Sequence, residues 1–190
     1  MRQSTILTAG CLLLLAAGPA AAHPGHSGGF IAGFAHPFSG LDHMLAMLAV
    51  GLWAGLAGGR QWLAWPATFV AFMLAGFMAG LVGGPQPMVE AAIAASVIGL
   101  GLAVAFNYRA PLAVGAAAVA VFGLAHGYAH GQEGALDETG FPLGFTLATL
   151  ALHAAGLGVA VAVRRFNASP AARTAGLGMA AAGLAMAWAG

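Results

Sequence analysis

The sequence predicts an all-α, polytopic membrane protein, a bundle of about six transmembrane helices. First, 61% of the 190 residues are hydrophobic and 6% are charged, whereas soluble domains carry about 25% charged residues. Second, the apolar residues form segments near the length of about 20 residues that crosses a bilayer core. Third, turn-forming and charged residues gather between these segments. Because so few charges cannot cover a water-facing surface, the bilayer is the expected solvent.

The N-terminus is typical of a cleavable signal peptide at residues 1–22. Arg2 supplies the positive end, Ile6 to Ala17 the apolar core, and Ala20-Ala21-Ala22 a small-residue cleavage site. A lipoprotein anchor at Cys11, the single cysteine, is less favoured because the apolar core lies mostly after it. Cleavage would leave residues 23–190 as one transmembrane domain with a periplasmic N-terminus. Without a cysteine, that domain would bind metal through imidazole, carboxylate, thioether or backbone oxygen.

Six apolar segments follow the signal peptide, separated by Gly, Pro, Asn and Arg residues. They are predicted as transmembrane helices at Leu41–Ala57, Trp62–Val82, Met88–Phe106, Pro111–His130, Phe141–Val163 and Ala171–Ala189. Six crossings from a periplasmic N-terminus place the loops after the first, third and fifth helices in the cytoplasm, and both termini in the periplasm.

The arginines support this topology. The three predicted cytoplasmic loops and their flanks carry every arginine after residue 22: Arg60, Arg109, Arg164, Arg165 and Arg173. Arginine and lysine concentrate on the cytoplasmic side of inner-membrane proteins. The pattern therefore predicts a multi-pass protein of a bacterial inner membrane.

Composition also excludes several functions. Lysine is absent and the net charge is +1, so the chain can form neither a retinal Schiff base nor a Walker ATP site. It has no basic patch for nucleic acid.

Glycine pairs at small-xxx-small spacing, Gly51/Gly55, Gly76/Gly80 and Gly127/Gly131, predict close helix packing. A homo-oligomer is left open.

Two clusters of ionisable residues flank the predicted membrane segments. His36, Asp42 and His43 precede and open the first helix, where Pro37 and Gly40 break regular structure and let His36 fold back toward Asp42. Asp42 either binds metal directly or orients a histidine ring. Since buried ionisable residues in membrane helices are costly, such a cluster is typical of function.

The second cluster ends the fourth helix. His126 and His130 are four residues apart and therefore share one helix face, which Glu133 approximately continues. By the predicted topology, both clusters lie at the periplasmic surface. Two imidazoles and a carboxylate form half of a site for a divalent transition metal.

Other residues are secondary metal candidates. His153 lies deeper in the fifth helix, where a plain helix–helix hydrogen bond is an equal alternative. Glu90 could join the entrance, and Met47 continues the face of Asp42 and His43, although methionines more often serve packing. His23 and His26 would form a metal-capturing tail or a mobile end.

The two clusters resemble the signatures of the HupE/UreJ family. The first reads His36-Pro-x-x-Gly40-x-Asp42-His43-x-Leu45-Ala46-Met47-x-Ala49-Val50-Gly51. The second, Phe-His-Gly-x-Ala/Val-His-Gly-x-Glu in the family, reads His126-Gly127-x-Ala129-His130-Gly131-x-Glu133, with Ala125 in place of Phe. The resemblance covers the whole chain after the signal peptide.

The resemblance implies a nickel permease associated with hydrogenase and urease operons, some related members being linked to cobalt. It implies that the functional residues are His36, Asp42, His43, His126, His130 and Glu133. The expected function is secondary import of Ni²⁺ or Co²⁺ from periplasm to cytoplasm, without a permanently bound cofactor and without enzymatic activity. The downstream hydrogenase or urease maturation system would be an indirect partner.

Three alternatives remain at this point. Histidines on facing helices could bind haem in a redox protein. His126, His130 and Glu133 could hold a catalytic metal in a membrane metalloenzyme. The chain could also bind metal without moving it, as a sensor or a delivery partner.

Overall fold

The computed structural model describes residues 29–132 and 140–189. The predicted signal peptide, His23, His26 and Glu133 lie outside these ranges. All regular structure in the described residues is helical, which confirms the all-α prediction. The elements are α2 (Phe30–Ala35), the 3₁₀ helix η1 (His36–Phe38), α3 (Leu41–Ala57), α4 (Gln61–Val82), α5 (Met88–Ala105), α6 (Leu112–Gln132), α7 (Phe141–Arg165) and α8 (Ser169–Ala189).

The helices α3 to α8 correspond to the six predicted segments, and the observed and predicted ends differ by two residues or fewer. Four of the described helices, α4 to α7, are long and apolar enough to cross a membrane. A fifth span results if the pair of Phe30–Phe38 and Leu41–Ala57, bent by 83°, counts as one. These spans are consistent with the predicted polytopic membrane class. Six crossings remain a prediction, because α8 is rich in Ala and Gly, carries Arg173 and is less apolar.

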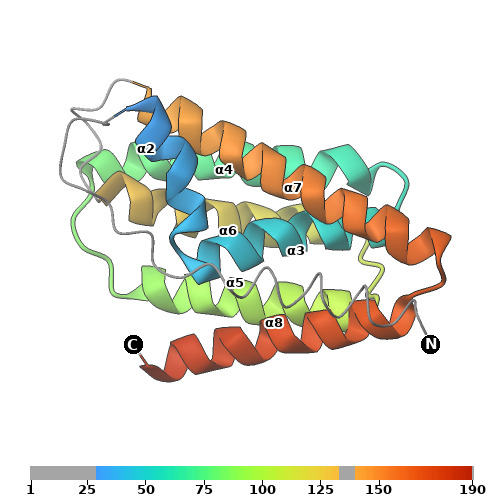
Figure 1. Ribbon diagram of the computed structural model, residues 1–190. Coiled ribbons are helices and arrows are strands. Elements are labelled where there is room, and N and C mark those ends of the chain that lie inside the picture. Colours follow the sequence, from blue (N-terminus) through green and yellow to red (C-terminus); the bar gives the residue numbers. More distant parts are fainter. Residues whose placement is uncertain (1–28, 133–139, 190) are drawn as a thin grey trace.

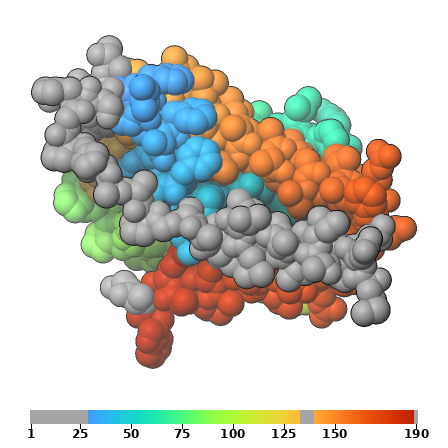
Figure 2. All heavy atoms as spheres, in the orientation of Figure 1, coloured from blue at the N-terminus to red at the C-terminus, as the bar shows by residue number. Residues whose placement is uncertain are grey.

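The short helix α2 and η1 were not predicted. They fold against the start of α7, as Figure 2 shows on the face turned to the reader. Pro37 within η1 and the extended backbone of Gly40 turn the chain before α3 begins. The sequence indicates a break at these residues, but the apolar stretch before them is too short to suggest a helix.

The helix α3 lies at the centre of the bundle. It packs on α7 on one side and on α5 on the other, while α5 runs beside α8 and α4 beside α6 (Figure 1). Every residue from Ala49 to Leu56 is buried. A helix that is apolar and buried all round is a core element, so the first membrane segment is the axis around which the others assemble.

Glycines allow these helix pairs to approach closely. Gly76 and Gly80 of α4 lie against backbone carbonyls of α6, and Gly127 and Gly131 of α6 lie against carbonyls of α4. Gly51 of α3 meets the carbonyl of a residue in α7 in the same way. A Cβ atom at any of these positions would collide with backbone. The predicted close packing is thus confirmed, between helices of one chain.

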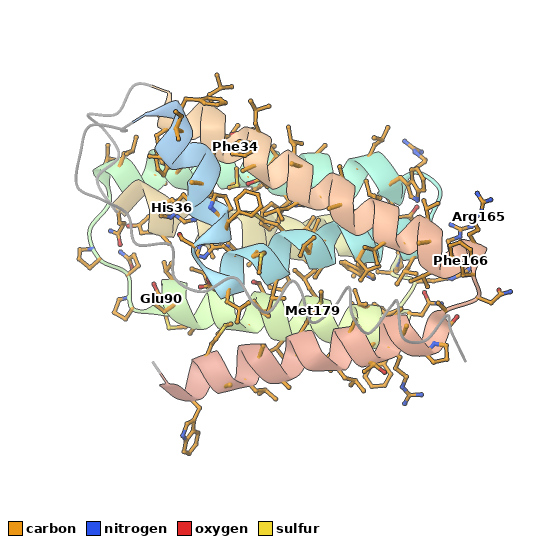
Figure 3. All side chains as sticks on the ribbon, in the orientation of Figure 1. Phe34, His36, Glu90, Arg165, Phe166 and Met179 are labelled. Carbon is orange, nitrogen blue, oxygen red and sulfur yellow. The ribbon has the colours of Figure 1, made fainter. Side chains whose placement is uncertain are left out.

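The bundle has two chemically different ends. Figure 3 shows His36 and Glu90 at one end and Arg165 at the other. The turns after α3, α5 and α7 carry or adjoin Arg60, Arg109 and Arg164 and lie at the arginine end, because successive helices alternate in direction. The end that carries His36 is called the histidine end below.

Replacing Gly127 with alanine tests the glycine contacts. The added methyl group would meet the Met73 carbonyl and the Phe77 amide nitrogen of α4, and overpacking of this kind costs about 1–3 kcal/mol. We expect a lower unfolding temperature in detergent and a smaller folded fraction by gel filtration. Gly178→Ala on α8 is the matched control, because no atom of the described residues lies within 4 Å of its added Cβ. Equal stability of the two variants would contradict the packing described here.

Candidate metal site

A carboxylate–imidazole pair opens α3. Asp42 Oδ1 accepts a hydrogen bond from the His43 backbone N–H at 2.8 Å and lies 2.7 Å from His43 Nδ1. Since a carboxylate only accepts, a neutral His43 ring carries its proton on Nδ1. Its Nε2 then has a free lone pair, and this buried atom has no hydrogen-bond partner among the described residues.

His126 is oriented by a serine. Ser96 Oγ lies 2.7 Å from the Ile93 carbonyl, to which it donates, and 2.9 Å from His126 Nε2. Because the hydroxyl has a single proton, it must accept from His126 Nε2–H. The lone pair of His126 is therefore on Nδ1, which is buried and has no partner in the described part of the chain. His126 itself is 0% exposed.

Ser96 was missed in the sequence. It is buried in the middle of α5, and its only signal was its polarity in a helix where Glu90 is the other polar side chain. Loss of a residue that orients the ring of a metal-ligating histidine typically lowers metal affinity by about 10–100-fold.

The predicted histidines converge in space. The ring centroid of His43 lies 4.8 Å from that of His126 and 4.4 Å from that of His130, and His36 lies 4.5 Å from His130. His36 reaches the cluster because the chain bends after α2, and its ring also packs against Phe141 and Phe145. The name histidine cluster is used below for His36, His43, His126 and His130 together with Asp42.

Asp42 contacts His43 and also lines a cavity. One carboxylate oxygen fixes His43, which favours the orienting role over direct metal binding at that oxygen. Asp42 also lines a cavity of about 420 Å³ between α3, α5 and α8 that Glu90 shares. The residues that line this cavity are Asp42, Pro87, Glu90, Ala91, Ile93, Ala94, Ala95, Ile98, Met186 and Ala187. The cavity therefore places the Glu90 carboxylate and the Asp42 carboxylate of the histidine cluster on one lining.

The described part of the cluster is not a closed metal cage. Within residues 29–132 and 140–189, no three His, Cys, Asp or Glu side chains are arranged to hold one ion. Glu133, the sixth predicted ligand, lies outside the described residues. In this geometry His43 and His126 each keep an oriented nitrogen lone pair that no hydrogen-bond donor of the described residues uses. Two such ligands suit an ion that keeps part of its water shell.

The remaining candidates lie deeper. His153 is 1% exposed and its ring lies 5.2 Å from the Phe69 ring, edge to face. Met47 is fully buried one turn after His43. Neither belongs to the ring contacts of the histidine cluster.

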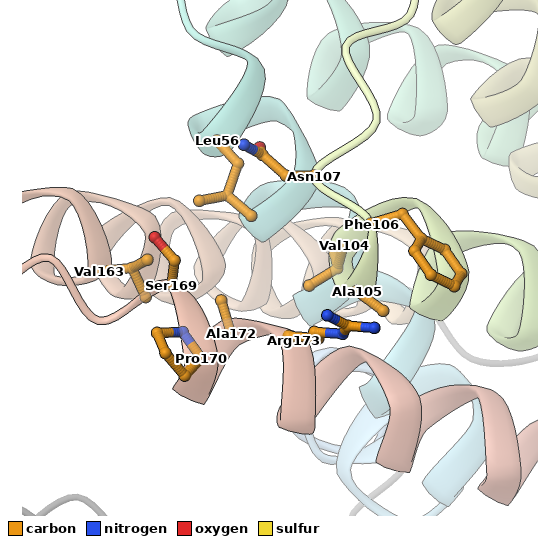
Figure 4. A pocket seen from close by; sticks show the side chains of 10 residues that line it. All are labelled: Leu56, Val104, Ala105, Phe106, Asn107, Val163, Ser169, Pro170, Ala172 and Arg173. Carbon is orange, nitrogen blue, oxygen red and sulfur yellow. The ribbon is translucent and has the colours of Figure 1, made fainter.

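A second cavity, of about 400 Å³, lies at the arginine end (Figure 4). It is lined by Leu56, Val104, Ala105, Phe106, Asn107, Val163, Ser169, Pro170, Ala172 and Arg173. No imidazole or carboxylate is among them, and the Arg173 guanidinium lies 6.0 Å from the Phe106 ring centre. This lining does not suit a metal cation.

Comparison with known proteins agrees with these observations. The chain is 43% identical to "Protein HupE" of Rhizobium leguminosarum bv. viciae over an alignment of 189 residues, and the match covers 98% of this chain and 98% of that protein. No solved structure matches. The family described as HupE / UreJ protein matches residues 11–186. Proteins of this family are transporter-like membrane proteins and not enzymes, as the sequence predicts. The chain belongs to the HupE/UreJ family.

Proposed function

We propose that the chain is a secondary permease that carries Ni²⁺, or the chemically similar Co²⁺, from the periplasm to the cytoplasm for metalloenzyme maturation. The observation that carries the proposal is the pair of oriented imidazoles. His43 and His126 each have one nitrogen fixed by Asp42 or Ser96 and the other buried and unpartnered within the described residues. Imidazole nitrogen is a preferred ligand of both metals.

The site is suited to transient binding. An imported ion must bind well enough to shed part of its water and weakly enough to leave. Two imidazoles with a nearby carboxylate provide partial replacement of the hydration shell. Glu133 would add a further oxygen ligand. Selectivity against copper, which binds such ligands more tightly, would come from geometry.

Energy for uptake is available without ATP. The membrane potential, negative inside, favours entry of a divalent ion by about 4–5 kcal/mol at 100 mV. The carboxylates of Asp42 and Glu90 border one cavity at the histidine end, which would raise the local cation concentration. The arginines at the opposite end support a cytoplasmic assignment for it.

The geometry does not favour a haem protein. The imidazoles of the histidine cluster pack at centroid distances of 4.4 to 4.8 Å, which leaves no space for a porphyrin plane between them. No histidine lines either cavity described above. The uptake experiment described next distinguishes a permease from a protein that binds the metal without transporting it.

Uptake of ⁶³Ni²⁺ tests the proposal directly, in cells without their own nickel importers and at matched membrane expression. Wild type should accumulate nickel, and Asp42→Ala should lose about 10–100-fold in apparent affinity because no side-chain acceptor then fixes His43. His43→Ala and His126→Ala should lose uptake. Gln86→Ala, an exposed polar residue of the α4–α5 turn, is the control. Absence of wild-type uptake of both ⁶³Ni²⁺ and ⁵⁷Co²⁺ would refute transport.

Ser96→Ala tests how His126 is oriented. The variant leaves His126 Nε2–H without its acceptor, so we expect apparent Ni²⁺ affinity to fall by about 10–100-fold. The control is Thr174→Ala, which removes an exposed hydroxyl that bonds within α8. Unchanged half-saturation of uptake in Ser96→Ala would show that Ser96 serves packing only.

Thiol labelling tests the direction. In a Cys11→Ala background, Gln86→Cys at the histidine end should react with a membrane-impermeant maleimide in intact spheroplasts. Tyr108→Cys, at the exposed turn of the arginine end, should react only after lysis. The reverse pattern would place the histidine cluster in the cytoplasm and contradict import through it.

A further inference from the structure

Two methionine sulfurs converge on one hydroxyl just below the histidine cluster. Thr149 Oγ1 of α7 lies 3.4 Å from Met47 Sδ of α3 and 3.6 Å from Met73 Sδ of α4. The same oxygen lies 2.9 Å from the Phe145 carbonyl. All three side chains are 0% exposed. Three helices thus bring two thioethers and a hydroxyl to one point in the core.

The hydroxyl cannot satisfy both sulfurs. Its single proton goes to the Phe145 carbonyl, the nearest and strongest acceptor, as is usual for threonine in a helix. Neither sulfur therefore receives that proton, so the lone pairs of Met47 and Met73 are not engaged in a hydrogen bond with Thr149. Their arrangement leaves soft lone pairs available in a buried position.

His153 lies one turn further along α7. It is four residues after Thr149 and therefore on the same face. It is 1% exposed, and neither ring nitrogen has a hydrogen-bond partner among the described residues. Leaving a buried polar group unsatisfied is unfavourable. An apolar side chain would fill the same space without this cost, so packing alone does not account for a histidine at this position.

The Phe69 ring lies between this region and the histidine cluster. The Phe69 centroid lies 5.8 Å from that of His126 and 5.2 Å from that of His153. Met73 is one turn away from Phe69 on α4. The polar and sulfur atoms of the core therefore continue from the histidine cluster toward the arginine end.

We propose that Met47, Met73, Thr149 and His153 form a second, inner binding station for a soft or borderline transition-metal cation on its way through the bundle. The inference rests on the proposed function, because it assigns the next position of the same ion. Thioether and imidazole suit such ions, whereas hard cations such as Mg²⁺ prefer oxygen ligands.

The inner station differs from the histidine cluster in charge. Its four side chains are neutral, and none of the buried residues of the described chain is an acid. Neutral ligands hold a divalent cation more weakly than a site that includes a carboxylate. The station would therefore be occupied briefly and would reject hard cations, while the histidine cluster captures the ion.

The double variant Met47→Leu/Met73→Leu tests the station by ⁶³Ni²⁺ uptake kinetics in cells. Leucine conserves volume and polarity but removes both sulfurs. We expect the maximal uptake rate to fall roughly tenfold, about 1.4 kcal/mol on the barrier, with the half-saturating concentration unchanged because capture is intact. The matched control is Met78→Leu/Met88→Leu, two methionines that are 63% and 75% exposed.

The outcomes separate the two proposals. Wild-type uptake rates in the double variant would overturn the inner station while leaving the permease standing, and so would a raised half-saturation with an unchanged maximal rate. If wild type itself takes up no nickel, the permease fails first. Should the double variant not fold in detergent, Thr149→Val and His153→Gln, measured in the same way, decide by the same criterion.

Discussion

The close approach of α6 to α4 and of α7 to α3 is the constraint on which the rest of the structure depends. Glycines face backbone carbonyls across both contacts, so the helices can pack nearer than side chains would allow. In a bilayer no hydrophobic effect drives helices together, and this contact surface must do so. The contacts also fix the depth of His126 on α6 relative to α4 and of His153 on α7 relative to α3.

Buried polar side chains are few in the described part of the chain, and two histidines are oriented by polar neighbours. Asp42 and Ser96 each hold one nitrogen of a histidine, leaving the other nitrogen available. An unsupported imidazole could rotate or change tautomer, which would disperse the lone pairs that a metal ion needs. Orientation by neighbours, more than the number of histidines, makes the cluster suited to bind an ion without enclosing it.

The two ends and the core together describe a graded path. Carboxylates of Asp42 and Glu90 border the cavity at the histidine end, imidazoles follow, and neutral sulfur, hydroxyl and imidazole groups lie beneath. Arginines occupy the opposite end. In the proposed permease, electrostatic attraction for a cation thus decreases along the bundle, which would favour capture at the histidine end and weaker binding in the core. In this scheme the membrane potential supplies the inward force that the ligands do not.

The sequence by itself determined the helical class, the extents of the six long helices and the residues of the two histidine motifs, because hydropathy and i, i+4 spacing are local properties. Only the tertiary structure decided which of these residues meet. His36 reaches His130 through a bend whose angle no local pattern specifies. Ser96, Met73 and Thr149 have no motif; each becomes a candidate only when a side chain from another helix lies beside it. Contacts between residues 30 to 102 positions apart arise from helix packing, and packing depends on the whole chain at once.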